Sequence, residues 1–169
     1  MAEHGYELEH LKTTYPEIQA DTIDETIIPG LNWLMERHNR PMMIDDSGLF
    51  IDSLKGFPGV YSAYVFKTVG CDGILRLMEG FKERSARFEC CIGFMVPGGK
   101  PSISRGTSRG SISKAKAGTG GFGYDPIFIP EGHTKTFAQF DIPAKNKISH
   151  RGRAIEAFLK ELPKLLPPS

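Results

Sequence analysis

Apolar residues recur along the chain with two different periods, and these periods divide it into elements. Isoleucine and leucine return at intervals of three and four over residues 22–38, which predicts an amphipathic helix with a kink or break at Pro29. Apolar and polar residues alternate over 86–96, which predicts a strand. Residues 101–112 are expected to return as one or two further strands, with bulges or bends at Gly106 and Gly110.

Shorter patterns complete the outline. Apolar residues 41–44 predict a buried strand that ends in a polar turn, Asp45-Asp46-Ser47-Gly48. Another strand is expected at 126–130, and helices are expected after Asp72 and Ser149. The sequence shows no repeat and no linker, so we expect one α/β domain over residues 1–169. Such folds place their chemistry where strands end, and the polar turn is therefore the first candidate site.

Charge and hydropathy exclude several classes of protein. The chain has 21 basic and 20 acidic residues, which argues against binding nucleic acid or a membrane surface through excess positive charge. It has no apolar run of roughly 18 residues and no signal-peptide pattern, so we expect a cytoplasmic protein that does not cross a membrane. The neighbouring Cys90 and Cys91 are expected to be reduced and to point to opposite faces of their strand.

Acidic residues suggest a metal site at the predicted turn. Asp45 and Asp46 could hold a hard cation such as Mg²⁺ or activate a water molecule; the alternative is that they cap the turn. Ser47 adds a hydroxyl group beside them. Glu17 could supply a third carboxylate, although a glutamate in this position is more often a plain surface residue.

A glycine-rich stretch, 118–123, leads into a candidate binding loop. Its glycines would let the backbone approach a planar ligand, Phe122 or Tyr124 would offer a stacking face, and Asp125 would offer an acceptor. The alternative is a tight turn with core aromatic residues.

Basic residues gather at the start of the closing helix. Lys145, Lys147, His150 and Arg151 surround a helix N-terminus, where free N–H groups favour an anion or an oxygen-rich group. The alternative is a solvated basic turn with a capping serine.

Four sequence blocks together resemble one family. They are Asp45-Asp46-Ser47-Gly48-Leu49, GFPGVYSA at 56–63, GFGYDPIF at 121–128 and SHRG at 149–152. In order and spacing they resemble the inosine/xanthosine triphosphate pyrophosphatases, the Ham1-like house-cleaning hydrolases of nucleotide metabolism. The resemblance covers nearly the whole chain from about Tyr15. It implies an elongated mixed β-sheet with flanking helices in two lobes around a nucleotide cleft, and a homodimer.

The resemblance also implies an activity and a role for each residue. Such enzymes use Mg²⁺ to hydrolyse ITP, dITP and XTP to the monophosphate and pyrophosphate, which removes these nucleotides from the pool. Asp46 would be the general base and a metal ligand, with Glu17 and Asp45 as further metal ligands. The implied substrate-binding residues are Ser47, Phe122, Gly123, Tyr124, Asp125, Lys145, His150 and Arg151.

One motif of the family has no counterpart ahead of Tyr15. The family begins with a strand and an Asn-x-x-Lys turn that holds the triphosphate. We therefore expect an N-terminally short chain with weak or absent activity and a less stable sheet. Two alternatives follow: an inactive nucleotide-binding module, or a Maf-like pyrophosphatase with another base preference, which the block 149–151 disfavours.

Overall fold

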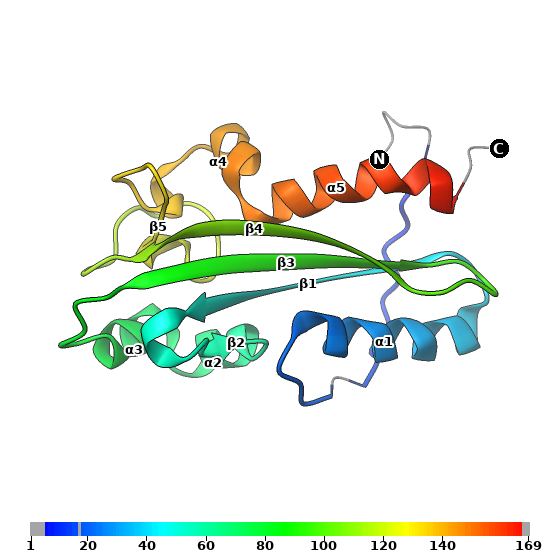
Figure 1. The fold of residues 1–169 in the computed structure, drawn as a ribbon, viewed down its shortest axis with the longest axis horizontal. Coiled ribbons are helices and arrows are strands. Elements are labelled where there is room, and N and C mark those ends of the chain that lie inside the picture. The colour runs from blue at the N-terminus through cyan, green and yellow to red at the C-terminus, as the bar shows by residue number, and fades with distance from the viewer. Residues whose placement is uncertain (1–5, 17, 167–169) are drawn as a thin grey trace.

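The computed structural model describes residues 6–16 and 18–166 (Figure 1). Long helices begin and end the described fold, and the strands lie between them. In chain order the elements are α1 (Ile23–His38), β1 (Met42–Ile51), β2 (Pro58–Gly59), α2 (Ser62–Thr68), α3 (Gly70–Leu77), β3 (Ser85–Met95), β4 (Ser102–Ile112), β5 (Phe128–Pro130), α4 (Ile142–Ile148) and α5 (His150–Leu165), with short 3₁₀ helices at Asp52–Leu54, Asp125–Ile127 and Phe137–Gln139.

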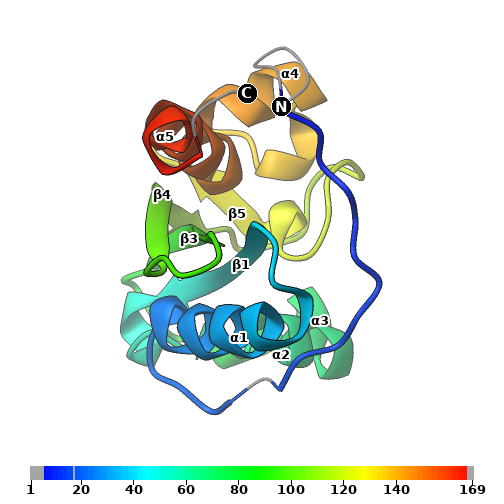
Figure 2. The same cartoon turned by 90° about the vertical axis from the view of Figure 1, so that its right-hand side faces the viewer.

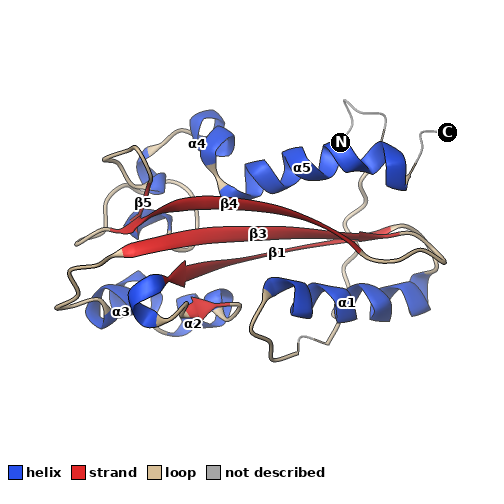
Figure 3. Ribbon diagram, viewed as in Figure 1, coloured by secondary structure: helices blue, strands red, loops and turns tan. Residues whose placement is uncertain are grey.

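The strands form one elongated sheet with helices on both faces. Its order is β2-β1-β3-β4-β5. Helices α1, α2 and α3 cover one face, and α4 and α5 lie on the other side (Figures 2 and 3). The α/β class with flanking helices is thereby confirmed. The resemblance implied a mixed sheet, whereas every pairing between the described strands is antiparallel.

Apolar side chains from the two faces of the sheet form separate cores. Ile27 and Leu31 of α1 pack with Cys91 on one face, while Phe158 of α5 packs with Cys90 on the other. The expected opposite orientation of the two cysteines is therefore confirmed. A third cluster joins α3 to the far end of the sheet. Within the described residues, no helix is both long and apolar enough to cross a bilayer.

Helix α1 is continuous through Pro29, so the predicted break into two pieces is wrong. It begins with a capping box, in which Thr22 accepts from Glu25 N at 3.4 Å and Thr22 N donates to the Glu25 carboxylate at 3.0 Å. A proline removes one helical hydrogen bond. Burial of Ile27 and Leu31 against the sheet holds the helix together on either side of it.

The predicted polar turn at 45–48 is also wrong, because β1 runs without interruption through these residues. Each of them faces a partner on β3: Asp45 lies opposite Ile92, and Asp46 lies opposite Cys91. The backbone hydrogen bonds of this ladder override the turn preference of the local sequence.

Residues 102–112 form a single strand, β4, and its one-to-one pairing with β3 has no bulge at Gly106 or Gly110. Gly106 is needed for close packing instead. A Cβ atom there would overlap the carbonyl oxygen of His150 and the amide nitrogen of Ala154 at the start of α5. The glycine thus sets how closely α5 approaches the sheet.

We expect Gly106→Ala to lower the free energy of unfolding by about 1–3 kcal/mol, because the added methyl group overpacks this contact. Urea denaturation measures the loss. Thr107→Ala is the matched control, since it changes the next residue of the same strand. An unchanged midpoint for Gly106→Ala would show that α5 moves away at little cost.

Candidate functional site

Strand β1 carries the two candidate acids to opposite faces of the sheet. Asp46 points to the α1 side, where Thr26 Oγ1 donates to its Oδ2 at 3.1 Å. Its other oxygen, Oδ1, accepts from the backbone N–H of Ser47 at 2.7 Å. Asp45 points to the α5 side, where Arg151 Nε donates to its Oδ2 at 3.1 Å. Neighbouring residues of a strand alternate in this way.

The structure therefore does not bring the carboxylates of Asp45 and Asp46 together as one paired group. Asp46 is half-buried, and Asp45 is more exposed and already paired with a guanidinium. Glu17, the third acid expected near the cation, lies outside the described residues. Over the described part of the chain, no three His, Cys, Asp or Glu side chains gather as a metal cluster.

Asp125 and Lys145 form a buried ion pair under the glycine-rich loop. Lys145 Nζ donates to Asp125 Oδ2 at 2.5 Å, and the two side chains are 12% and 2% exposed. The same Asp125 oxygen also accepts from the backbone N–H of Phe122 at 2.7 Å. Asp125 thus holds the loop and the lysine in place, in addition to being the acceptor that the sequence suggests.

Of the two predicted stacking residues, only Phe122 offers a face to solvent. It is 56% exposed, and its ring lies below two cations, with Lys145 Nζ at 4.6 Å and Arg151 Cζ at 5.1 Å from its centroid. Tyr124 is 3% exposed and donates its hydroxyl to the carbonyl of Ser62 at 2.9 Å. Burial raises the pKa of Tyr124. Gly123 between them adopts a left-handed φ of 59°, which favours glycine.

Helix α5 begins inside the protein with a histidine. Ser149 caps the helix by accepting from Gly152 N at 3.1 Å, as predicted. His150 is 2% exposed, and its ring stacks on Phe88 with centroids 4.5 Å apart. Burial, with the positive charges of Arg151 and Lys145, lowers the pKa of His150 to about 3. The imidazole is therefore neutral at neutral pH, and its Nδ1 finds no hydrogen-bond partner among the described residues.

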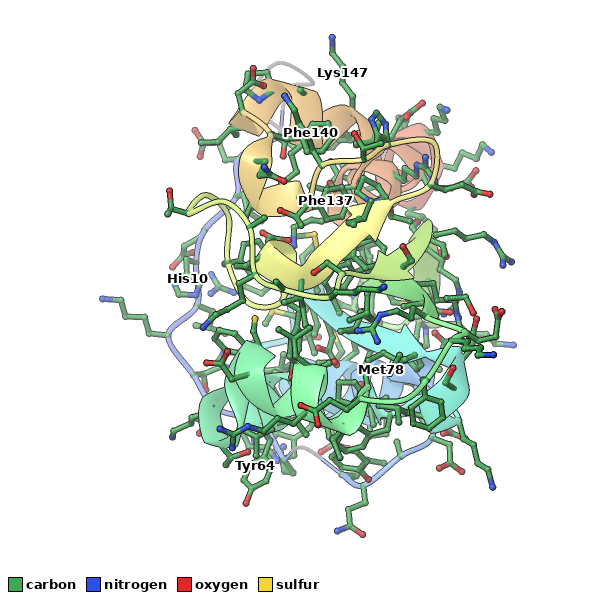
Figure 4. The ribbon with its side chains drawn as sticks, turned by 90° about the vertical axis from the view of Figure 1, so that its left-hand side faces the viewer. His10, Tyr64, Met78, Phe137, Phe140 and Lys147 are labelled. Atoms are coloured by element: carbon green, nitrogen blue, oxygen red, sulfur yellow. The ribbon has the colours of Figure 1, made fainter. Side chains whose placement is uncertain are left out.

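The four basic residues of 145–151 do not all join the site. Lys145 and Arg151 lie over Phe122, and His150 is buried at the start of α5. Lys147 points away from the body of the protein at the end of α4 (Figure 4). Lys145, Phe122, Arg151 and Asp45 therefore form a continuous series of contacts from α4 to β1.

A cavity of about 650 Å³ adjoins the site at Asp45. It lies between the first described residues, strand β1 and helix α5. Tyr6, Leu11, Met43, Phe158 and Leu166 are among its lining residues. The extended N-terminal segment crosses this side of the molecule (Figure 2).

Comparison with known proteins accounts for this arrangement. A sequence model of the Ham1 family matches residues 1–161. The chain belongs to the Ham1 family. The dITP/XTP pyrophosphatase of Pyrococcus horikoshii is 54% identical over 94% of this chain and 84% of that protein. The dITP/XTP pyrophosphatase of Thermococcus kodakarensis is 52% identical over 91% of this chain and 83% of that protein.

Solved Ham1 structures share the fold. The Staphylococcus aureus Ham1 protein superimposes with a TM-score of 0.84 at 32% identity, over 90% of this chain and 82% of that one. A Ham1 protein from Coxiella burnetii gives a TM-score of 0.81 at 34% identity, over 88% and 81%. The Ham1 resemblance inferred from the sequence blocks is thereby confirmed.

Thr26 is a site residue that nothing in the sequence singled out. It lies inside α1 and is separated from Asp46 by 20 positions. A threonine within a helix is ordinarily satisfied by a backbone carbonyl of the preceding turn. Only the packing of α1 on β1 reveals its contact with Asp46.

We expect the stability of this Ham1 protein to fall below about pH 6.5, because the unfolded chain then protonates His150 and the folded chain does not. Protonation of His150 alone lowers the free energy of unfolding by up to roughly 1.4 kcal/mol for each pH unit down to about pH 3. His150→Leu should flatten the profile of unfolding free energy measured in urea at a series of pH values. The matched control is His10→Gln, at an exposed histidine. Equal slopes for wild type and His150→Leu would contradict the buried, neutral state.

Proposed function

We propose that this chain is a nucleoside triphosphate pyrophosphatase that hydrolyses deaminated purine nucleotides, dITP, ITP and XTP, to the monophosphate and pyrophosphate. The observation that carries this proposal is the relatives' activity. The curated proteins that are 54% and 52% identical to this chain are dITP/XTP pyrophosphatases, and the alignment spans more than four fifths of each. The exposed ring of Phe122, with Lys145 and Arg151 over it, supports a planar, oxygen-rich ligand.

Phe122 is the proposed platform for the base. An exposed aromatic ring stacks on a planar purine, and Lys145 and Arg151 at its face offer hydrogen-bond donors. Gly123, Tyr124 and Asp125 would shape the loop around the nucleoside. Deaminated purines carry a 6-keto oxygen, which accepts hydrogen bonds from such donors. Adenine has a 6-amino group there, which would place a second donor opposite them. An unpaired buried polar group costs on the order of 1–3 kcal/mol, which supplies selectivity.

His150 adds a second reason for an oxygen-rich ligand. Its buried Nδ1 is without a partner in the described structure, and such atoms are costly unless a ligand or water satisfies them. The atom lies at the N-terminus of α5, where helix N–H groups also favour an acceptor.

Asp46 is the proposed general base. Its carboxylate would take a proton from a water molecule as the water oxygen bonds to the α-phosphorus. The bond from the α-phosphorus to the bridging oxygen then breaks, and pyrophosphate leaves with the electron pair. Ser47, the next residue of β1, would contact the substrate through its hydroxyl group. Its backbone N–H orients the Asp46 carboxylate.

Mg²⁺ is the proposed cation. Mg²⁺ commonly binds through one or two carboxylates together with waters and substrate phosphates, and the half-buried carboxylate of Asp46 fits this donor set. Glu17 would be the second carboxylate. Asp45 points to the opposite face of β1 and is paired with Arg151, so in this arrangement its carboxylate does not join Asp46 in holding the same ion. When bound, the ion would neutralise charge on the phosphates.

The proposed reaction acts on free nucleotides, so the proposal includes neither a nucleic-acid nor a membrane partner. It also places the protein in the cytoplasm, where the nucleotide pool is used. The homodimer implied by the resemblance stays a prediction.

The first test is substrate selectivity. With Mg²⁺ present, we expect pyrophosphate release from dITP, ITP and XTP to exceed release from ATP by roughly 10- to 100-fold in kcat/KM, because adenine lacks the 6-keto oxygen. A coupled pyrophosphate assay measures each rate. Equal rates on all substrates would contradict the proposed selectivity. Binding of ITP without turnover, measured by calorimetry, would instead indicate a nucleotide-binding module.

The second test concerns the general base. Asp46→Asn should lower kcat by roughly 10²- to 10⁴-fold, because the amide cannot accept the proton of the attacking water. The same pyrophosphate assay applies, with circular dichroism to show that the variant is folded. Asp52→Asn, an exposed acid just beyond β1, is the matched control and should stay active. A fully active Asp46→Asn would overturn this mechanism.

A further inference from the structure

The side chain of Thr26 reaches Asp46 from another element of the fold. Thr26 is the fourth residue of α1, and its Oγ1 lies 3.1 Å from Asp46 Oδ2 and 2.7 Å from the carbonyl oxygen of Ile23. The hydroxyl has one proton and two lone pairs, so the proton is shared between two acceptors or given to one. A charged carboxylate is the stronger acceptor.

The Thr26 hydroxyl does not need Asp46 to satisfy its hydrogen-bonding capacity. A threonine within a helix is already satisfied by the carbonyl of the preceding turn, here that of Ile23. Thr68 in α2 shows this ordinary arrangement, with its hydroxyl donating to Tyr64 O at 3.0 Å and to Val65 O at 3.2 Å. At Thr26 one of the two acceptors is instead a carboxylate of another element, which is a feature of its place beside β1.

The N-terminal turn of α1 is held firmly, which fixes where the Thr26 hydroxyl lies. The capping box of Thr22 and Glu25 closes the first turn. Arg105 of β4 binds both carboxylate oxygens of Asp24, at 2.7 and 2.8 Å, and contacts Glu89 of β3 at 3.4 Å. These bonds anchor the start of the helix to two strands, so Thr26 meets Asp46 in a fixed position.

We infer that Thr26 is a positioning residue for the Asp46 carboxylate. The backbone N–H of Ser47 holds Oδ1 and the Thr26 hydroxyl holds Oδ2, so rotation of the carboxylate would break both hydrogen bonds. This inference rests on the proposed function, because it assigns Thr26 a part in the same hydrolysis.

The test removes the hydroxyl but keeps the shape of the side chain. Thr26→Val should lower kcat for dITP by roughly 10- to 100-fold, the usual effect of losing an outer hydrogen bond to an active-site ligand. KM should change little, because Thr26 touches none of the proposed base-binding residues. Thr26→Ser restores the hydroxyl and should recover most of the wild-type kcat.

Thr68→Val is the matched control, because it removes the same kind of hydroxyl from a helix away from Asp46. It should leave kcat unchanged. The midpoint of thermal unfolding is measured for all variants. A purely structural role would lower the midpoint of Thr26→Val without a selective loss of kcat, and serine would then give no selective rescue.

The outcomes separate this inference from the proposed function. If the wild-type chain fails to release pyrophosphate from deaminated nucleotides, the proposed function fails, and the role of Thr26 in it fails too. If the wild type is active and Thr26→Val keeps its kcat, only the positioning inference is overturned. A selective loss of kcat that serine restores supports both.

Discussion

The ladder between β1 and β3 holds the candidate site together, because its register decides which face of the sheet each side chain of β1 meets. Asp46 pairs with Cys91 and points to α1, while Asp45 pairs with Ile92 and points to α5. A slip of one residue would exchange the two acids and also move Ile44 out of the α1 core. Burial of apolar residues on both faces therefore fixes the chemistry as well as the fold.

The two helical layers make different contributions to the site. The α1 layer holds Asp46 through a threonine, and the first turn of this helix is anchored by Asp24 and Arg105. The α4–α5 layer holds Lys145 and Arg151 over the ring of Phe122. It reaches β1 through the ion pair of Arg151 with Asp45. The proposed reacting group and the proposed base-binding group thus lie on opposite sides of one strand, which packs against both layers.

The sequence allowed the periodic elements to be predicted, but not how they meet. Alternation over 86–96 correctly predicted β3 and the opposite orientation of Cys90 and Cys91. The same alternation separates Asp45 from Asp46, yet four polar residues in a row are typical of a turn, and only pairing with β3 makes them a strand. Phe122 could not be distinguished from Tyr124, because the burial of Tyr124 depends on its contact with α2. The contact of Thr26 required the packing of α1.

The site also retains polar groups that do not favour folding by themselves. Burying the Lys145–Asp125 pair removes two charges from water, and its mutual attraction offsets this cost only when the geometry is good. Burial of His150 has a cost too, because it leaves the Nδ1 atom without a partner in the described structure. A ligand atom that bonds to this nitrogen would recover the lost hydrogen bond in the bound state alone. The free energy that folding loses at His150 would then be recovered when the proposed ligand binds, so ligand binding would also stabilise the fold.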